Sequence, residues 1–341
     1  MSRYLVVHPD FELTWPQAPD YLYEFWSADR DVAYVRVDAD DDRPLSAVLD
    51  DPADVEKLVC LGVPVTGDCL DALANLEEAT VMDGAYGPDE AVHEELRSRG
   101  VALRAHESGD FWGESVAELG VGLTIGAMRR IPQKRAAMTE SRDPWDRDRW
   151  EAGADRGYGG LQGTDDDPFY THGTVAGTRV RAVGVGNIGS RYLDYLGAMG
   201  ADVAAHDPYA PDAAFHRIGA RRVHHLDAVL EDAEVFAPLL PVTDETRGLI
   251  DRERVDALPE GCLLVLITRA AVTDFEAVRE RVTSDEIALA ADVFDAEPLD
   301  VDDPLLGRDN VVHTPHVGGR TERANEEWAR QLLARFDEGS A

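Results

Sequence analysis

The sequence predicts an α/β protein with two domains, each built on a doubly wound parallel sheet. Short apolar runs alternate with amphipathic stretches along most of the chain, which is the pattern of parallel strands joined by helices. A length of 341 residues, of which 44% are hydrophobic, is enough for two separate cores. A glycine-rich turn near the middle of the chain opens a second series of strands and helices, so one sheet is expected from each series.

The first series occupies roughly the first hundred residues. Its expected strands are rich in valine, leucine and aromatic residues, and are YLVVH, VAYVRV, VEKLVCLG, LEEATVM and VALRAH. Helices are expected at DCLDALAN and at PDEAVHEELRSRG, where Gly100 follows two arginines in the last turn. The opening MSRYLVVHPD has one arginine and a short apolar run, which indicates a first strand and not a signal peptide.

A helical stretch and an irregular segment connect the two series. The stretch GESVAELGVGLTIGAMRRIPQKRAAMT has apolar residues at helical spacing, and Pro132 is expected to kink it or to end its first segment. Residues 140–174 have weak periodicity and many Asp, Arg and Gly residues, so an exposed arm is expected there. The second series runs from TRVRAVGVG to about Val312. The last stretch predicts an amphipathic helix whose inward face consists of Trp328, Leu332, Leu333 and Phe336.

The charge balance argues against some partners. Asp and Glu total 67 against 33 Lys and Arg, which gives a formal net charge of −34. The acids are spread along the chain, and this favours a salt-adapted cytoplasmic protein over an ordinary acidic one. At molar salt the Debye length falls to about 3 Å, so the self-repulsion of such a surface is screened. A surface this acidic argues against nucleic acid and anionic membranes as partners.

The cysteines, histidines and apolar runs narrow the class further. Cys60, Cys69 and Cys262 form no CxxC pair and are odd in number, so buried thiols in a reducing cytoplasm are expected. The longest apolar runs, such as CLLVLI, are far too short to cross a bilayer. His313 and His316 have H-x-x-H spacing, but no cysteine or third histidine supports a metal, and none is expected.

Gly184, Gly186 and Gly189 form a G-x-G-x-x-G turn between an expected strand and an expected helix, as in a Rossmann-like dinucleotide site. The first glycine allows a tight turn, the second lets the backbone approach a pyrophosphate, and the third brings the helix close to its strand. The amides of Asn187 and Ile188 would then face the pyrophosphate at the helix N-terminus. A lone match also fits a packing loop, so the interpretation depends on the residues that come after the turn.

The strand DVAAHD supplies the second part of such a site. It ends at Asp207, 18 residues after Gly189, close to where an acid binds the adenosine ribose hydroxyls. A carboxylate there accepts from the hydroxyls and repels a 2′-phosphate, so NAD is expected and NADP is the less favoured alternative. Asp207 before Pro208 is also a common start of a turn. The order of strand, turn, helix and acid favours the dinucleotide interpretation.

The second half of the chain resembles the NAD-dependent D-2-hydroxyacid dehydrogenases. Five motifs occur in that family's order over roughly residues 115–321, namely GVGNIG, LLPVTDETRGLID, LLVLITRAAVTD, ADVFDAEPL and VVHTPHVGG. The resemblance implies NAD as cofactor and hydride transfer between NAD(H) and a small D-2-hydroxy acid and its 2-oxo acid. Glyoxylate, hydroxypyruvate and pyruvate are the substrate types expected. A homodimer formed across the nucleotide-binding domains is also implied.

The resemblance implies that Arg269, Glu297 and His316 are the catalytic residues. Arg269 follows a strand, and its guanidinium can hold a carboxylate and a carbonyl oxygen. His316 can give a proton to the developing alkoxide, and Glu297 can pair with it and favour its protonated form. Outside their motifs, the three would more often be surface or loop residues in so acidic and arginine-rich a chain. An acid at Glu297, where formate dehydrogenases carry an amide, favours oxo-acid reduction.

Further contacts are implied more weakly, and each of these positions could instead be strand or turn packing. The loop beside the nicotinamide ribose and phosphates supplies Leu240, Pro241 and Thr246. Asp292 is expected at the nicotinamide amide. The remaining cofactor positions are Ile267, Thr268 and Gly318. The turn DGAYG resembles a loop whose amides bind the substrate carboxylate, which gives Ala85, Tyr86 and Gly87.

These motifs divide the chain into a discontinuous substrate domain, residues 1–115 and 317–341, and an NAD-binding Rossmann domain, residues 116–316. Two positions depart from the family pattern. Leu239 stands where many members carry histidine, and Ala270 where a glycine often follows the arginine. No C-terminal regulatory domain of the kind appended to some phosphoglycerate dehydrogenases is expected. The alternative function is a non-catalytic NAD(H)-sensing binding protein on the same fold.

Overall fold

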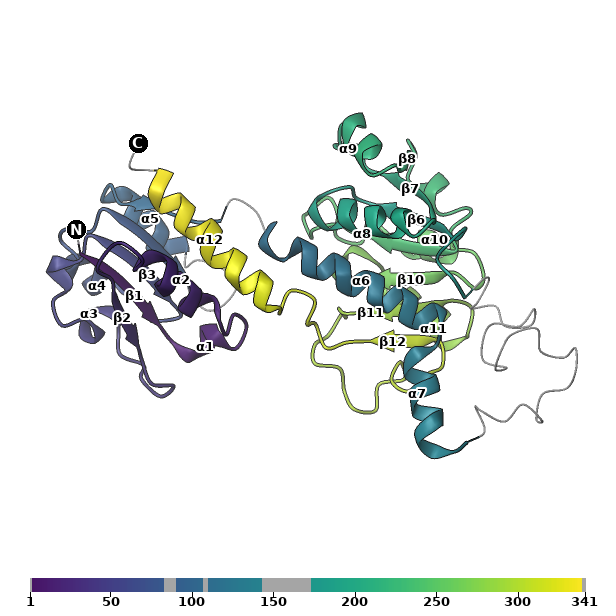
Figure 1. Ribbon diagram of the computed structural model, residues 1–341, viewed down its shortest axis with the longest axis horizontal. Helices are drawn as coiled ribbons and strands as arrows, with labels where there is room; N and C mark the ends of the chain where they lie inside the picture. The colour runs from purple at the N-terminus through teal and green to yellow at the C-terminus, as the bar shows by residue number, and fades with distance from the viewer. Residues whose placement is uncertain (1, 83–89, 107–109, 143–172, 339–341) are drawn as a thin grey trace, which may run out of the picture. The chain divides into compact units, whose positions relative to one another are not determined.

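The computed structural model describes residues 2–82, 90–106, 110–142 and 173–338 (Figure 1). The chain forms two compact units, which are Met1–Trp112 with Arg320–Ala341 (unit 1) and Gly113–Gly319 (unit 2). The limits of the units lie three residues from the boundaries expected after residues 115 and 316. Each unit contains one parallel sheet with helices, so the predicted fold class is confirmed.

Unit 1 contains a five-stranded parallel sheet in the order β2-β1-β3-β4-β5. Its strands are β1 (Arg3–Val7), β2 (Ala33–Arg36), β3 (Lys57–Leu61), β4 (Glu78–Met82) and β5 (Ala102–Leu103). Its helices are α1 (Pro9–Glu12), α2 (Ala18–Trp26), α3 (Leu45–Val48), α4 (Gly67–Ala72), α5 (Glu90–Ser98) and α12 (Glu322–Glu338), with short 3-10 turns at Pro52–Asp54 and Asp110–Trp112. The central strand β3 is buried along its whole length, as expected for a parallel sheet covered on both faces.

Helix α12 belongs to unit 1 although the whole of unit 2 precedes it in the chain. It packs against α2, and the Trp328 ring meets Phe11 edge to face with centroids 5.4 Å apart. The rings of Phe336 and Trp26 lie 5.3 Å apart. The predicted inward face is confirmed, because Trp328, Leu332 and Phe336 are buried and Leu333 is partly buried. Burial of each large side chain contributes roughly 2 kcal/mol, which holds the two segments of unit 1 together.

A buried charge cluster joins the first residues of β3 and β4. Lys57 Nζ lies 2.6 Å from Glu78 Oε1, and Arg104 Nε donates to Glu78 Oε2 at 2.8 Å. The side chains of Lys57 and Glu78 are only 5% and 10% exposed. Burial by itself raises the pKa of Glu78, but the bonds from Lys57 and Arg104 outweigh it and hold that pKa below its usual value. The carboxylate therefore stays charged, and each buried charge faces an opposite one.

Replacing Glu78 with glutamine is expected to lower the free energy of unfolding by about 3 kcal/mol at neutral pH, because Lys57 then stays buried without a carboxylate. Since the folded-state pKa of Glu78 is depressed, the pair stabilises the protein above the unfolded-state value of about 4.3 and stops doing so as pH falls through the folded-state value. The wild type and E78Q should therefore converge in stability in acid. Denaturant unfolding at several pH values measures this. The exposed neighbour Glu77→Gln is the control, and equal stability of E78Q and wild type at neutral pH would contradict the prediction.

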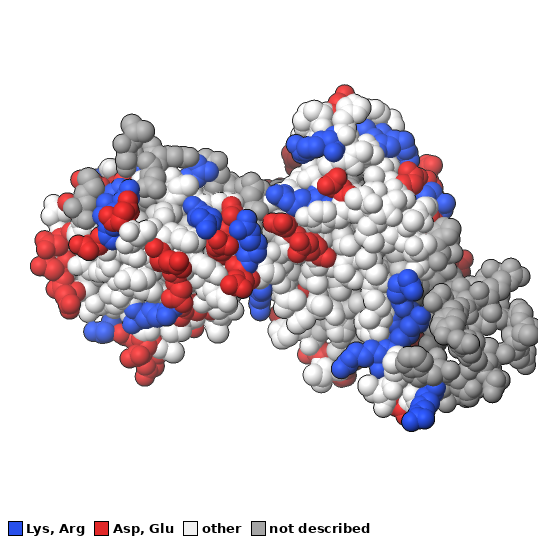
Figure 2. All heavy atoms as spheres, viewed as in Figure 1, with Lys and Arg blue, Asp and Glu red and all other residues white. Residues whose placement is uncertain are grey.

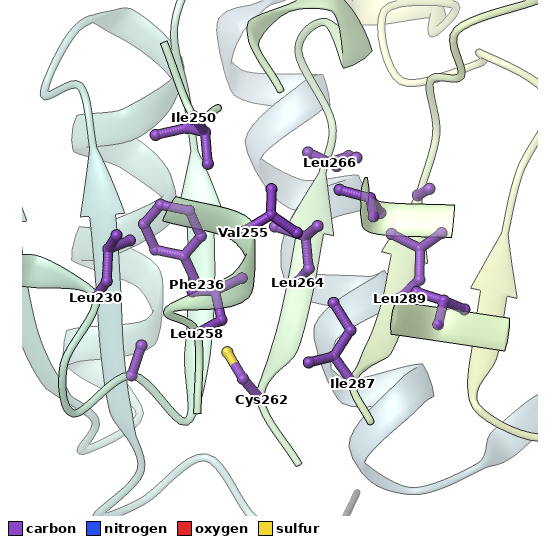
Figure 3. Close-up of a cluster of buried hydrophobic side chains, with 14 of the residues drawn as sticks. Leu230, Phe236, Ile250, Val255, Leu258, Cys262, Leu264, Leu266, Ile287 and Leu289 are labelled. Atoms are coloured by element: carbon purple, nitrogen blue, oxygen red, sulfur yellow. The ribbon is translucent and has the colours of Figure 1, made fainter. Parts of the chain in front are cut away.

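Unit 2 contains a seven-stranded parallel sheet in the order β12-β11-β10-β9-β6-β7-β8. Its strands are β6 (Arg179–Val183), β7 (Asp202–His206), β8 (Arg221–Arg222), β9 (Val235–Pro238), β10 (Leu263–Leu266), β11 (Ala288–Ala291) and β12 (Val311–His313). Its helices are α6 (Gly113–Met128), α7 (Ile131–Glu140), α8 (Asn187–Ala198), α9 (Asp212–Arg217), α10 (Arg252–Asp256) and α11 (Phe275–Thr283), with 3-10 turns at Asp227–Val229 and Ala270–Val272. Strands β9, β10 and β11 are wholly buried, and the side chains of Phe236, Leu264 and Leu289 lie in one apolar core (Figure 3).

Helices α6 and α7 are separate, with Arg130 between them in the left-handed region at φ 47°. Pro132 lies in the first turn of α7, where a missing N–H removes no helical hydrogen bond. Of the two outcomes expected for Pro132, the structure therefore shows that the first helical segment ends. The arm expected over residues 140–174 lies almost entirely outside the described residues.

The distribution of acidic side chains and the state of the cysteines agree with what the composition predicts. Acidic side chains lie on both units in the face shown in Figure 2. Cys60, Cys69 and Cys262 are free and buried, as predicted. Burial raises the pKa of Cys60 and of Cys262 to about 12, so both thiols stay protonated and unreactive at neutral pH. No helix in the described part of the chain is long and apolar enough to cross a membrane.

Candidate dinucleotide and active site

The strand order of unit 2 changes direction between β6 and β9. From β6 the chain steps through β7 to β8, and from β9 it steps the opposite way through β10 and β11 to β12. The pairs are parallel, so the carboxyl ends of all seven strands lie along one edge of the sheet. Open α/β sheets bind ligands outside this edge at such a switch point. The predicted cofactor and catalytic residues that the structure describes follow these strand ends.

The glycine turn follows β6, and contacts with the backbone explain two of its three glycines. Gly184 has a φ of +97°, and a Cβ there would lie 2.5 Å from the carbonyl oxygen of Leu239. A Cβ on Gly189 would lie 2.2 Å from the carbonyl oxygen of Gly184. Any side chain at either position would push strand and helix apart, so both glycines are required by packing.

Gly186 is different, because a Cβ there would meet no protein atom within 4 Å. It is the N-cap of α8 and makes no side-chain capping bond, and Asn187 and Ile188 form the first positions of the helix. The first amides of a helix have no acceptor within the helix and attract anions. The open space at Gly186 beside these amides therefore fits a pyrophosphate, which is the group that a dinucleotide would place there.

Replacing Gly186 with alanine is expected to weaken NADH binding about tenfold or more while leaving the thermal unfolding midpoint nearly unchanged. The methyl group enters the space that the pyrophosphate needs, but it touches no protein atom. NADH fluorescence titration and thermal unfolding measure the two effects. Gly122→Ala on α6, also in open space, is the control and should leave NADH binding intact. Unchanged NADH affinity in G186A would contradict the assigned position of the pyrophosphate.

Asp207 directly follows β7, beside the glycine turn. Its Oδ2 accepts from the amide of Val185 at 2.8 Å, and its Oδ1 accepts from the amides of Tyr209 and Ala210 at 2.9 and 3.0 Å. Asp207 thus makes the turn that its place before Pro208 suggested, and it also ties that turn to the glycine loop. Each carboxylate oxygen has two lone pairs, so these bonds leave one lone pair, on Oδ2, for a ribose hydroxyl.

The loop after β9 lies against the glycine turn through Leu239 and Leu240, whose atoms come within about 3 Å of a Cβ built on Gly184. Thr246 closes this loop, since its hydroxyl donates to the carbonyl of Pro241 at 2.5 Å and accepts from the amide of Thr243 at 2.8 Å. The loop is therefore held in shape by its own side chains at the predicted cofactor position. Leu239 is buried, so its side chain packs where many family members carry histidine.

Arg269 follows β10 and is exposed. Its Nη1 donates to the carbonyl of Thr268 at 2.7 Å, and among the described residues no carboxylate oxygen lies within 4.0 Å of its guanidinium. Most of this cation's hydrogen-bonding capacity is therefore left for a ligand. Thr268 is buried and donates to the carbonyl of Pro238, and Ile267 is buried with its side chain at Gly120 of α6. These two residues can offer a cofactor chiefly their backbones.

His316 and Glu297 form a hydrogen-bonded pair, with His316 Nδ1 2.7 Å from Glu297 Oε2. Their side chains are 36% and 34% exposed, so a ligand can reach them. The other carboxylate oxygen of Glu297, Oε1, accepts from the amide of Phe294 at 2.8 Å, and this bond fixes the side chain. His316 has a φ of +52°, a conformation that few residues other than glycine adopt. The chain thus holds an imidazole in an unusual backbone position against a carboxylate that is itself anchored.

Asp292 is 1% exposed and anchors the loop that carries His316. Its Oδ1 accepts from the Thr314 hydroxyl at 2.6 Å and from the Val317 amide at 2.9 Å. Its Oδ2 accepts from the amide of Gly318 at 2.8 Å, where a Cβ would come within 2.9 Å. Sequence reasoning placed Asp292 and Gly318 at the cofactor and missed Thr314. The spacing of these residues gave no sign of the bonds that link them.

The structure brings Glu297 and His316 into contact, and it places Arg269 after the strand next to β11. Strands β10, β11 and β12 are neighbours in the sheet, and neighbouring strands lie about 4.8 Å apart. The three predicted catalytic residues therefore come from adjacent strand ends of unit 2. The structure does not describe the three residues predicted to bind the substrate, which are Ala85, Tyr86 and Gly87. In the described part of the chain, no three His, Cys, Asp or Glu side chains form a group that could hold a metal ion.

A glycine turn at the switch point of a parallel sheet defines a dinucleotide-binding domain of the Rossmann type. Residues 121–318, more than half of the chain, match the family model for the D-isomer specific 2-hydroxyacid dehydrogenase, NAD binding domain. The chain therefore belongs to the D-isomer specific 2-hydroxyacid dehydrogenase family, and NAD is the cofactor of this domain. The family and the cofactor predicted from the sequence are confirmed.

Several known proteins are similar over most of this chain. The D-3-phosphoglycerate dehydrogenase of Methanocaldococcus jannaschii is 29% identical over 78% of this chain and 46% of its own length. The hydroxypyruvate reductase of Thermotoga maritima is 27% identical over 80% of each chain. This chain thus spans about half, or less, of the phosphoglycerate dehydrogenases it matches.

Solved structures share the fold. The D-lactate dehydrogenase of Escherichia coli, in its apo form, has a TM-score of 0.67 at 23% identity and covers 99% of this chain and 96% of its own. The D-lactate dehydrogenase of Aquifex aeolicus, complexed with NAD and lactic acid, has a TM-score of 0.62 at 19% identity over 99% and 96% of the two chains. Both therefore have the same two-sheet architecture.

Proposed function

We propose that this protein is an NAD-dependent oxidoreductase that interconverts a small D-2-hydroxy acid and its 2-oxo acid. The observation that carries the proposal is the bond of 2.7 Å between His316 Nδ1 and Glu297 Oε2 at the cofactor-binding edge of unit 2. Arg269 follows β10, two strands away from β12, which His316 follows, and it supplies a cation for a substrate carboxylate. These are the groups that reduction of a 2-oxo acid requires of a protein.

When bound, NADH supplies the hydride that adds to the carbonyl carbon of the 2-oxo acid. Arg269 binds the substrate carboxylate and the carbonyl oxygen through its fork of N–H groups, which orients the acid and stabilises the charge that develops on that oxygen. His316 bonds Glu297 through Nδ1, so Nε2 is the nitrogen that gives the proton to the oxygen. The balanced reaction is 2-oxo acid, NADH and one proton to hydroxy acid and NAD⁺. In the reverse direction Nε2 takes the proton.

We propose that the substrate is of the glyoxylate, hydroxypyruvate or pyruvate type. The similar proteins named hydroxypyruvate reductase and D-lactate dehydrogenase support acids of this size. Ala85, Tyr86 and Gly87 are proposed to bind the carboxylate through backbone amides. NAD over NADP is proposed from Asp207, whose carboxylate repels a 2′-phosphate.

A non-catalytic NAD(H)-sensing protein remains the alternative function. It needs the glycine turn and Asp207, but it needs neither an imidazole held against a carboxylate nor an arginine with an open guanidinium. The bonds that fix Glu297 to both His316 and Phe294 therefore favour an enzyme. We also propose a homodimer and a salt-adapted cytoplasmic protein, the latter from the net charge of −34 and three buried thiols.

NADH oxidation with a panel of 2-oxo acids at molar salt tests the proposal. We expect turnover with at least one small acid, no turnover with the corresponding amide, and a clear preference for NADH over NADPH. Tight NADH binding with no turnover of any 2-oxo acid would support the NAD(H)-sensing alternative instead. Gel filtration with light scattering at the same salt tests the dimer.

A further inference from the structure

A hydrogen bond between two side chains connects the loops that follow β7 and β9. The hydroxyl of Tyr209 donates to Glu245 Oε2 at 3.1 Å. Tyr209 lies two residues after Asp207, at the position assigned to the adenosine ribose. Glu245 lies in the loop closed by Thr246, next to the position assigned to the phosphates. The bond therefore links two parts of the predicted dinucleotide site.

The sheet order places this bond across the glycine turn. Strands β7 and β9 pair with β6 from its two sides, so the loops after them are separated by the turn that follows β6. At about 4.8 Å between neighbouring strands, the distance to be crossed is roughly 10 Å, which a tyrosine and a glutamate can span together. A dinucleotide that lies along the carboxyl edge from Asp207 to the nicotinamide position must pass this crossing.

The backbone of Tyr209 and the loop that carries Glu245 are both anchored by other hydrogen bonds, while the side chain of Tyr209 is not packed. The Tyr209 amide is held by Asp207 Oδ1, and the Glu245 loop is held by Thr243 and Thr246. Tyr209 is 83% exposed, so little packing holds its ring in place. The bond to Glu245 raises the pKa of Tyr209 from its ordinary value, which keeps the phenol protonated as a donor throughout the neutral range. The bond to Glu245 thus joins an exposed aromatic ring to a loop that is held in shape by its own side chains.

We infer that Tyr209 and Glu245 form a strap over the adenosine half of bound NAD(H), and that this strap limits how fast the cofactor enters and leaves. The inference rests on NAD(H) binding by unit 2 and deepens the proposed function. The strap opens by breaking the Tyr209–Glu245 bond and closes again over the bound adenosine. Because the bond exists both before and after binding, its removal lowers the barrier in both directions and changes the equilibrium little.

Stopped-flow fluorescence of NADH binding tests the strap with Tyr209→Phe and Glu245→Ala, which each remove the same bond. Both variants are expected to raise the association and dissociation rate constants about fivefold, which corresponds to roughly 1 kcal/mol for one exposed hydrogen bond. The double variant should equal either single one, since the two residues share one interaction. Asp244→Ala removes the adjacent carboxylate of the same loop and is the matched control, with rates near the wild type.

Two results would overturn the strap. Unchanged rate constants in Y209F and E245A would show that the bond does not control exchange. A rise in the dissociation rate alone, with weaker NADH binding, would make the two residues ordinary contacts of the cofactor. The outcome is separate from the proposed catalysis, since a protein that binds NADH through the strap and reduces no 2-oxo acid would sink only the proposed function.

Discussion

Replacing Arg269 with alanine is expected to lower kcat/KM for a 2-oxo acid by about 10³-fold, or roughly 4 kcal/mol of transition-state stabilisation. The guanidinium has no carboxylate within 4.0 Å among the described residues, so its charge is open to a bound acid. Loss of this group removes the partner of the substrate carboxylate, which raises KM. It also removes the donor that stabilises charge on the carbonyl oxygen, which lowers kcat.

Two further variants separate this role from a loss of structure. Arg269→Lys keeps the charge but not the bidentate fork, so an intermediate loss is expected. Arg252→Ala removes an exposed arginine that pairs with Glu280 in the same unit, and it should change kcat/KM less than twofold. NADH titration should give wild-type affinity for all three variants. If R269A kept more than a tenth of the wild-type kcat/KM, Arg269 would not bind the reacting acid.

The glycine turn of the cofactor-binding edge could be predicted from the sequence, because the backbone conformation of the turn itself requires glycine at fixed positions. Gly184 needs glycine for its own φ of +97°, and Gly189 is a glycine because a Cβ there would enter the carbonyl oxygen of Gly184 in the same turn. Asp207 is close enough along the chain for strand and turn patterns to locate it. The alternation of strands and helices likewise predicted two parallel sheets, since buried parallel strands form short apolar runs.

The rest depends on contacts between residues that are distant in the sequence. The bonds from Asp292 to Thr314, Val317 and Gly318 join residues more than 20 positions apart, so no local period predicts them. The charge cluster around Glu78 and the Tyr209–Glu245 strap are of the same kind, because their partners are 21 to 36 positions away. Sequence patterns specify which side chains are polar, but only the sheet order decides which of them meet.

Replacing His316 with asparagine is expected to have the largest effect on the proton transfer. Asparagine tolerates the left-handed backbone at φ +52° better than other residues do, so the loop held by Asp292 should keep its shape. It cannot transfer a proton at neutral pH, and kcat should fall by about 10³-fold with little change in NADH affinity. His313→Asn, three residues earlier and exposed, is the control and should keep nearly wild-type kcat.

Glu297 provides the second test of the same step, because it touches His316 and acts through it. Glu297→Gln should lower kcat about 10- to 100-fold, less than loss of the imidazole, since a neutral amide still bonds the ring but stabilises its charge less. Adding E297Q to H316N should then lower kcat no further, because the carboxylate has no imidazole left to hold. Steady-state kinetics of the four proteins measure this cycle. If the double variant were slower than H316N by the full E297Q factor, Glu297 would act on the substrate independently of His316.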